Sequence, residues 1–478
     1  MTAILGAGIS GLSAGYYLLR KGLTPSSVLI LETSNRVGGW IRSERFDSEG
    51  YVFESGPRTI RPKGLAASNT LDLIEDVGLA DQVYPIFSNH VAARNRMIYA
   101  KGKLNMLPSD VVGVLKTKPP FTKPLFMAGF KDLFTGRSSV RLEDETIYSF
   151  VNRRFGREIA DYAISAMLCG ICAGDAKQIS VKFLMKRMFE MEQAHGGVIK
   201  GFLKDALFRK KQQDTKAQDS SELAKRAKAE NWSIYSIYGG LQTLPIRIGL
   251  ILKEQMVDIR TDVTFEEIVF DGNQILLKVD GKERVVDRLI SSIPSYKLAK
   301  HVEKQHPSLS KELAAIPFVD VAVINIRYKT PNLQKYEAFG FLVPPIENLP
   351  ILGVIFDSCC FDMENNTVLT VMMGGSWFEK WFGTNPKEEQ LLTVALEQLR
   401  KILGIREPPD SYKVNILRKC IPQYVVGHHK RVDAIRQYIR EHKIPLALCG
   451  SSYDGVGVND VILSARECVD GLIGNGFK

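Results

Sequence analysis

The chain has 478 residues, of which 45% are hydrophobic and 24% are charged, and this ordinary composition excludes a fibrous, disordered or disulfide-stapled protein. Its formal net charge of +10 favours anionic partners, which include phosphorylated cofactors, carboxylate substrates and acidic lipid surfaces. Because neither zinc-ligand spacing nor a basic–aromatic RNA-binding pattern accompanies that charge, we expect no metal and no nucleic acid partner.

The cysteine count, the length of the apolar runs and the start of the first predicted strand indicate the compartment and the kind of membrane contact. Seven cysteines, an odd number in a long chain, indicate a reducing compartment. No run of 18 or more apolar residues occurs, so we expect any membrane contact to be peripheral. The first predicted strand begins at Thr2 or Ala3, from which we expect no cleaved presequence.

The first thirty-two residues predict a strand, a glycine-rich turn, a helix and a second strand. The strands are residues 2–5 and 28–31, and the helix runs from Ser10 to Arg20. Glu32 ends the second strand, 21 positions after the last glycine of the turn. This order and spacing are typical of a dinucleotide-binding unit, in which the acid accepts hydrogen bonds from an adenosine ribose.

The turn has the pattern G-x-G-x-x-G, formed by Gly6, Ala7, Gly8, Ile9, Ser10 and Gly11. The first glycine allows the tight turn, the second lets the backbone approach a pyrophosphate, and the third lets the helix pack closely on the strand. The helix N-terminus then presents free N–H groups to the phosphates.

The residues that follow distinguish FAD from NAD. Arg36-Val37-Gly38-Gly39 lies just beyond the ribose acid, where a simple NAD domain continues into another strand–helix unit. Taken alone, the glycine pair is also compatible with a plain surface turn. Residues 54–59, with sequence Glu-Ser-Gly-Pro-Arg-Thr, resemble the loop that reaches the isoalloxazine in amine-oxidase-like flavoproteins. Together these patterns favour FAD.

Later segments are expected to return to the same cofactor. Residues 239–245 resemble the Gly-Gly-x-x-x-Leu-Pro step of that superfamily, and short strands follow, with Val263 near the adenine. Residues 446–450 predict a strand that ends in glycine, and a small-residue loop then opens a helix through Ala465 and Val469. Backbone amides of that loop suit the flavin pyrimidine edge and can stabilise negative charge on a reduced ring.

Several stretches resemble the protoporphyrinogen oxidase family in its animal form. They span nearly the whole chain, more weakly at 207–229 and after 466, and are residues 36–43, 56–62, 118–126, 371–377, 420–424 and 456–460. The resemblance implies an α/β plus α+β fold with a discontinuous, Rossmann-like two-dinucleotide-binding FAD domain, a mixed-sheet substrate domain and a helical membrane-associating domain. We expect the FAD domain to comprise residues 1–90, 231–300 and 426–478, and the helical domain to comprise residues 91–207. A charged mobile segment is expected at 208–230, and the substrate domain at 301–425.

The resemblance also implies the reaction and its partners. It is an oxygen-dependent six-electron oxidation of protoporphyrinogen IX to protoporphyrin IX in haem biosynthesis, with hydride transfer to FAD N5 and flavin reoxidation that gives hydrogen peroxide. It further implies non-covalent FAD, a homodimer, an anionic membrane surface at the mitochondrial inner membrane, and hand-off to ferrochelatase.

Site residues carry over from the family by position. The substrate residues are Arg96 for a propionate and Phe339, Gly340, Leu342 and Met372 for an apolar wall, with the Gly170 carbonyl assisting proton removal. The expected cofactor-binding residues are Gly6, Ala7, Gly8, Ile9, Ser10, Gly11, Glu32, Thr33, Arg36, Gly39, Trp40, Gly56, Pro57, Arg58, Thr59, Val263, Ser451, Val456, Gly457 and Val458.

Plainer interpretations remain open from the residues alone. Phe339 and Leu342 also fit a core strand, and Arg96 fits a solvated surface cation. Cys169 and Cys172 have redox C-x-x-C spacing but lie in a predicted helix, which favours two cysteines in a pocket wall. The rival functions are another amine oxidase or desaturase of the same fold and a non-catalytic Rab-escort or GDP-dissociation-inhibitor type binding protein.

Overall fold

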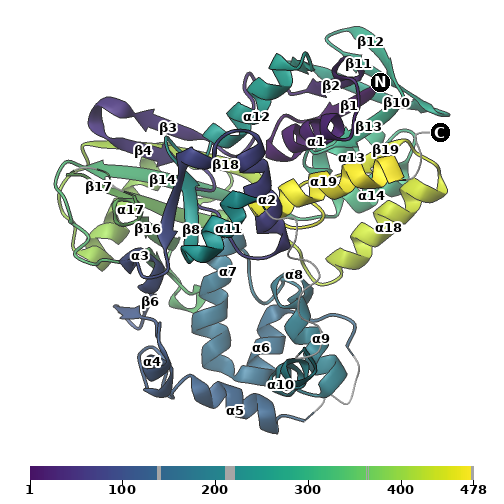
Figure 1. Ribbon diagram of the computed structural model, residues 1–478. Helices are drawn as coiled ribbons and strands as arrows, with labels where there is room; N and C mark the ends of the chain where they lie inside the picture. The colour runs from purple at the N-terminus through teal and green to yellow at the C-terminus, as the bar shows by residue number, and fades with distance from the viewer. Residues whose placement is uncertain (137–141, 210–220, 362, 364, 475–478) are drawn as a thin grey trace.

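The computed structural model describes residues 1–136, 142–209, 221–361, 363 and 365–474. Figure 1 shows a layered α/β region that contains the N-terminus, a large sheet beside it, and a group of helices below both. Short 3-10 turns occupy Pro25–Ser27, Asp47–Glu49, Ala80–Gln82 and Pro345–Glu347.

The centre of the α/β region is a five-stranded parallel sheet. Its strands, in spatial order, are β19 (Leu446–Leu448), β13 (Arg288–Ser291), β1 (Thr2–Leu5), β2 (Val28–Leu31) and β9 (Asp258–Arg260). These strands come from three distant parts of the chain, so the predicted discontinuous Rossmann-like fold is confirmed.

Helices and a small sheet cover the two faces of this parallel sheet. One face packs against α1 (Ile9–Arg20), α12 (Thr243–Glu254) and α19 (Val458–Gly474). The other face packs against a three-stranded sheet and three helices, namely β10 (Phe265–Asp271), β11 (Gln274–Val279), β12 (Lys282–Val286), α13 (Ser295–Val302), α14 (Pro307–Ala314) and α18 (His428–Glu441). Burial on both faces explains why β1 and β2 are continuous apolar runs.

A group of short elements joins the α/β region to the rest. Strand β3 (Ser43–Phe46) pairs with β4 (Tyr51–Glu54) in one two-stranded sheet, and β5 (Val83–Phe87) pairs with β8 (Trp232–Ile237) in another. Helix α2 (Leu65–Asp76) packs against α11 (Glu222–Ala229).

Beside the α/β region lies a mixed seven-stranded sheet. Its order is β18 (Ser411–Pro422), β14 (Phe318–Tyr328), β17 (Thr367–Gly375), β16 (Ile351–Phe356), β15 (Gly340–Leu342), β6 (Met97–Ala100) and β7 (Lys103–Met106). Three helices are associated with it, α15 (Asp357–Cys360), α16 (Phe378–Phe382) and α17 (Glu388–Leu403).

The positions of some elements differ from the expected divisions. Strands β6 and β7 pair with this sheet, although a boundary at residue 91 assigned them to the helical part. Helix α14, in the segment expected to belong to the substrate domain, packs in the α/β region's core rather than with the second sheet. Within the expected mobile segment 208–230, residues 210–220 lie outside the described residues, whereas α11 is a helix with buried Leu223 and Ala227. All three differences arise from packing across the chain, which local composition does not report.

The helical part contains α4 (Val111–Leu115), α5 (Phe126–Phe134), α6 (Ile147–Phe155), a π-helical stretch (Ile159–Ile164), α7 (Ser165–Cys172), α8 (Val181–Leu184), α9 (Lys186–His195) and α10 (Val198–Arg209). Helix α3 (Val91–Arg94) precedes it. Figure 1 shows α4 and α5 at its lower edge, far from the parallel sheet, with α7 running upward toward α11 and β8.

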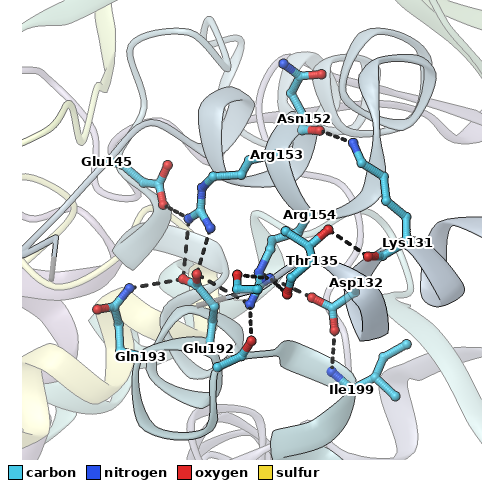
Figure 2. Close-up of polar contacts among 12 residues, drawn as sticks. Lys131, Asp132, Thr135, Glu145, Asn152, Arg153, Arg154, Glu192, Gln193 and Ile199 are labelled. Carbon is cyan, nitrogen blue, oxygen red and sulfur yellow. Dashed lines mark hydrogen bonds and ion pairs between the residues drawn. The ribbon is translucent and has the colours of Figure 1, made fainter. Parts of the chain in front are cut away.

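A buried charge network holds these helices together (Figure 2). Arg154 is fully buried, 3.3 Å from Asp132 and 3.4 Å from Glu192, and Arg153 pairs with Glu192 and Glu145. Asp132 also accepts a hydrogen bond from the Ile199 N–H at 2.8 Å. The network therefore connects α5, α6, α9 and α10, and each of its charged side chains has at least one oppositely charged partner.

Candidate active site

The glycine-rich turn after β1 has room only for glycine at two positions. Gly6 has φ of +92°, a conformation that side chains disfavour. A Cβ atom on Gly11 would lie 1.9 Å from the Gly6 carbonyl oxygen. The N-terminus of α1 can therefore approach β1 closely, as the G-x-G-x-x-G pattern requires.

Glu32 is oriented by three hydrogen bonds at the end of β2. Its carboxylate accepts from the Ala7 N–H and from the N–H and hydroxyl of Ser34, each at 2.8 Å. The Val263 N–H donates to the Glu32 carbonyl at 3.1 Å, so the residue expected near the adenine lies beside the residue expected to bind the ribose. Thr33, next in the chain, is exposed.

A second glycine turn faces the first. The Gly38 N–H donates to the Ala7 carbonyl at 2.8 Å, and a Cβ atom on Gly39 would lie 3.0 Å from the Gly8 Cα. The Arg36 guanidinium donates to the carbonyls of Val37, Gly39 and Ile41 and so supports this turn. The two turns form a cradle of bare backbone that a Cβ atom would fill, which fits the diphosphate of a dinucleotide.

The loop after β4 connects this cradle to the second sheet. A Cβ atom on Gly56 would lie 2.1 Å from the carbonyl oxygen of Trp40, whose ring is 41% exposed. The buried Arg58 guanidinium forms a 2.6 Å ion pair with Asp357 of α15. The Arg58 side chain therefore serves the contact between regions, and the expected cofactor contact of Arg58 stays a prediction. Pro57 and Thr59 flank it in the same loop.

Glu54, at the end of β4, is a buried carboxylate with neutral partners. It accepts hydrogen bonds from the Ser43 hydroxyl at 2.8 Å and the Leu241 N–H at 2.7 Å. Burial raises the pKa of Glu54 to about 7, although those two bonds lower it. This carboxyl group therefore titrates near neutral pH.

The loop between β19 and α19 returns to the glycine-rich turn, as expected. A Cβ atom on Gly450 would lie 3.4 Å from the Ser10 hydroxyl oxygen, so the two ends of the chain meet here. The Gly457 N–H donates to Asp460 at 3.1 Å, and Val458 is the first residue of α19. Helix α19 therefore begins at this loop, and it packs beside α1, the helix that follows the glycine-rich turn.

Two expected substrate residues from different regions lie together. A Cβ atom on Gly170 of α7 would lie 2.9 Å from Leu342 Cδ2 on β15. Helix α7 ends at Cys172, so no N–H within it can reach the Gly170 carbonyl in the usual i−4 pattern. The exposed Gly170 backbone thus lies against a half-buried apolar side chain.

The other wall residues occupy neighbouring clusters. Gly340 has φ of +141°, and a Cβ atom there would lie 2.1 Å from the Val354 carbonyl oxygen, so only glycine fits. Met372 packs in an apolar cluster with Cys169, and Phe339 packs in another with Ala92. Phe339, Leu342 and Met372 are each half-buried, which leaves part of each side chain open to a ligand.

Arg96 directly precedes β6, whose Met97 pairs with Phe341 of β15. Loss of surrounding water and the positive charge of nearby Arg61 lower the pKa of Arg96. Across the described parts of the chain, no carboxylate lies within ion-pair distance of either arginine. The Arg61 carbonyl accepts from the Asn459 side chain at 2.9 Å, which places Arg61 between Arg96 and the C-terminal loop.

Arg61 is a candidate functional residue that the sequence analysis missed. It lies in the family-like stretch 56–62, but an arginine there has no pattern that separates it from a surface cation. Its closeness to Arg96 was the missing signal. Two cations without a carboxylate partner among the described residues have the charge to bind a molecule with more than one carboxylate.

The C-x-x-C pair lies in a buried, apolar environment. Cys169 and Cys172 are both buried, and burial raises the pKa of Cys172 to about 12 and also raises the pKa of Cys169. Because a thiol becomes reactive when its pKa is lowered, this environment favours two cysteines of a pocket wall over a redox pair.

Known proteins resemble the chain over nearly its whole length. Residues 9–473 match the family described as flavin containing amine oxidoreductase. The protoporphyrinogen oxidase of Bos taurus is 38% identical and that of Homo sapiens 36% identical, and each alignment covers 98% of both chains. A solved structure from Exiguobacterium sp. 255-15, described as a candidate protoporphyrinogen oxidase, has a TM-score of 0.79, 23% identity and 99% coverage of both chains.

Proposed function

The chain belongs to the protoporphyrinogen oxidases, within the flavin-containing amine oxidoreductases, and we propose that it oxidises protoporphyrinogen IX to protoporphyrin IX with dioxygen as the acceptor. It is an FAD-dependent oxidase. The single observation that carries the substrate proposal is the unpaired pair Arg61 and Arg96 beside the half-buried wall of Phe339 and Leu342.

The residues of the cradle fit FAD held without a covalent bond. Bare backbone at Gly8 and Gly39 would receive the diphosphate, and Glu32 would accept from the ribose hydroxyls. The loop at Ser451 and Val456 would meet the flavin ring. When bound, FAD supplies a hydride acceptor at N5, and its reoxidation by dioxygen gives hydrogen peroxide; three such cycles remove six electrons.

The chain's own residues bind, orient and dehydrate the substrate. Protoporphyrinogen is an apolar macrocycle with two propionates, so Arg96 and Arg61 would each pair with a carboxylate. Leu342 and Phe339 would pack on the pyrrole rings and exclude water. The carbonyl of Gly170, a residue whose Cα faces Leu342, would accept a proton from the ring or stabilise developing positive charge.

Exposed apolar side chains support attachment to a membrane surface. On α4 and α5 these are Val111 (75% exposed), Leu115, Phe130 and Phe134 (84% exposed), with Lys116 and Lys123 beside them. Among the described residues no helix is both long enough and apolar enough to cross a bilayer. We propose peripheral attachment to the anionic face of the mitochondrial inner membrane through this surface. A homodimer and hand-off to ferrochelatase, also proposed, rest on the family resemblance.

The direct test supplies protoporphyrinogen under air to the flavin-loaded protein. We expect enzyme-dependent porphyrin fluorescence together with hydrogen peroxide, in a ratio of three peroxides to one porphyrin. The same assay without added protein measures spontaneous oxidation. Bound flavin without enzyme-dependent fluorescence would remove this substrate and leave only the oxidase class, to be tested next with amines.

A further inference from the structure

Tyr424, two residues after β18, bonds to two residues of the loop between β19 and α19, Ser451 and Gly455. Its hydroxyl donates to the Ser451 carbonyl at 2.6 Å and accepts from the Gly455 N–H at 2.8 Å. Tyr424 is 2% exposed, and burial raises the pKa of its hydroxyl well above the usual range. The hydroxyl therefore stays neutral and can donate and accept at the same time.

The Tyr424 ring is fixed by a second aromatic ring. His428 stacks on it, with ring centroids 3.8 Å apart and planes 13° from parallel. His428 is fully buried, and neither of its ring nitrogens has a hydrogen-bond partner in the part of the chain that the structure describes. Burial lowers the pKa of His428 to about 4, so the stacked ring is neutral. The imidazole thus supports the Tyr424 ring as a flat, neutral surface.

The same segment also contacts the end of α7. The Gln423 side chain donates to the Cys172 carbonyl at 2.9 Å, and the Ser180 N–H donates to the Tyr424 carbonyl at 2.8 Å. Two adjacent residues thus connect the helix that carries Gly170 with the loop that carries Ser451 and Gly455. The contacts join the expected proton-accepting side of the site to the expected flavin side.

We propose that Tyr424 is a positioning residue that holds loop 451–457 in the conformation that meets the flavin ring and fixes its separation from the end of α7. Without the hydroxyl, the buried Gly455 N–H and the Ser451 carbonyl lose the partner that joins them. This proposal deepens the proposed function, and it rests on that function for the reaction but not for the binding of FAD.

The test compares Tyr424→Phe with Tyr453→Phe, using FAD as the probe. Tyr453 is also fully buried in this loop, but its hydroxyl has no hydrogen-bond partner among the described residues, so its removal is a matched control. We expect the Kd for FAD to rise roughly tenfold in Tyr424→Phe. We also expect a changed visible circular dichroism spectrum of the flavin and a changed affinity for sulfite, which reacts with the ring directly. Tyr453→Phe should match the wild type in all three.

Activity separates this proposal from the proposed function. At saturating FAD, Tyr424→Phe should lower kcat for protoporphyrinogen and leave KM within about twofold, because the carboxylate-binding arginines are untouched. If protoporphyrinogen is not a substrate, the three flavin measurements still decide the role of Tyr424. A second variant, His428→Leu, keeps the hydroxyl and removes the stacking ring; it should change the same flavin properties less. Equal FAD affinity and equal flavin spectra in Tyr424→Phe and Tyr453→Phe would overturn the proposal.

Discussion

Arginines of the helical part and the two arginines of the expected substrate site have opposite surroundings. Arg153 and Arg154 contact carboxylates on several sides, and Arg154 is completely buried (Figure 2). Arg61 and Arg96 are exposed and lack such partners among the described residues. A buried charge with every partner in place stabilises an arrangement of helices, whereas an unpaired charge beside an apolar wall is available to an anionic ligand. The same residue type therefore indicates structure in one region and recognition in the other.

Removal of a buried partner should have the largest effect. In Arg154→Met, the buried carboxylates of Asp132 and Glu192 lose a cation, and we expect the free energy of unfolding to fall by about 3–5 kcal/mol. Urea unfolding followed by circular dichroism measures this change. The control is Arg157→Met, since Arg157 is 78% exposed and pairs with Asp161 at the surface. Equal stability of the two variants would contradict the structural role of the network.

Glu54 is an intermediate case, because it is a buried acid with neutral hydrogen-bond partners. Its raised pKa of about 7 means that the folded state holds a proton that the unfolded state releases near pH 4.5, so stability falls as pH rises between these values. Above pH 7 the full cost of burying the charge is present. The free energy of unfolding of Glu54→Gln should therefore be about 1–3 kcal/mol higher than that of the wild type at pH 8. At pH 4 the two proteins should differ little in stability.

The pH dependence is the part of this prediction that identifies Glu54. Thermal or urea unfolding at pH 4, 6 and 8 measures it, and Glu397→Gln, at an exposed position on α17, is the control. A Glu54→Gln variant whose stability difference from the wild type is the same at every pH would show that Glu54 is not titrating in this range.

Arg96 should affect binding rather than folding. Arg96→Leu removes one unpaired cation, and we expect KM for protoporphyrinogen to rise roughly 10- to 100-fold with kcat changed less, because a charged hydrogen bond to one propionate is lost in ground and transition states alike. Steady-state porphyrin fluorescence measures both constants. Arg94→Leu, two residues earlier and also exposed, is the matched control. An unchanged KM in Arg96→Leu would assign Arg96 to the solvated surface.

Local patterns predicted the dinucleotide cradle, because its parts lie close together in the chain. The glycine turn, the helix and Glu32 occupy the first 32 residues, and each has a requirement that sequence spacing expresses. The return of β19 to the same sheet was predicted from the family pattern. The buried partner of Arg58 was not, because Asp357 is 299 positions away and nothing near either residue indicates the other.

The substrate side was predicted only in part for the same reason. Gly170 and Leu342 were expected at the site, and their contact is a long-range one that the structure supplies. Strand β6 pairs with β15 across more than half the chain, so a local composition boundary at residue 91 could not place it. Arg61 was missed because unpaired and paired arginines have the same local sequence signal, and only their neighbours in space distinguish them.

Substitution of Arg61 should have a smaller effect than substitution of Arg96, and the size of that effect tests whether the expected substrate site binds two carboxylates. We expect Arg61→Gln to raise KM for protoporphyrinogen by about 3- to 10-fold. The effect is smaller because Arg96, although partly exposed, has lost part of its surrounding water, and a charge in that environment contributes more than a well-solvated one. If each arginine binds its own propionate, the KM increases of Arg61→Gln and Arg96→Leu should multiply in the double variant. If both bind one propionate, the double variant should resemble Arg96→Leu alone.

Lys63→Gln removes an exposed cation two positions from Arg61 and controls for the general loss of positive charge. An equal KM increase in Lys63→Gln would mean that the charge acts over the whole surface and that Arg61 has no direct contact with the substrate.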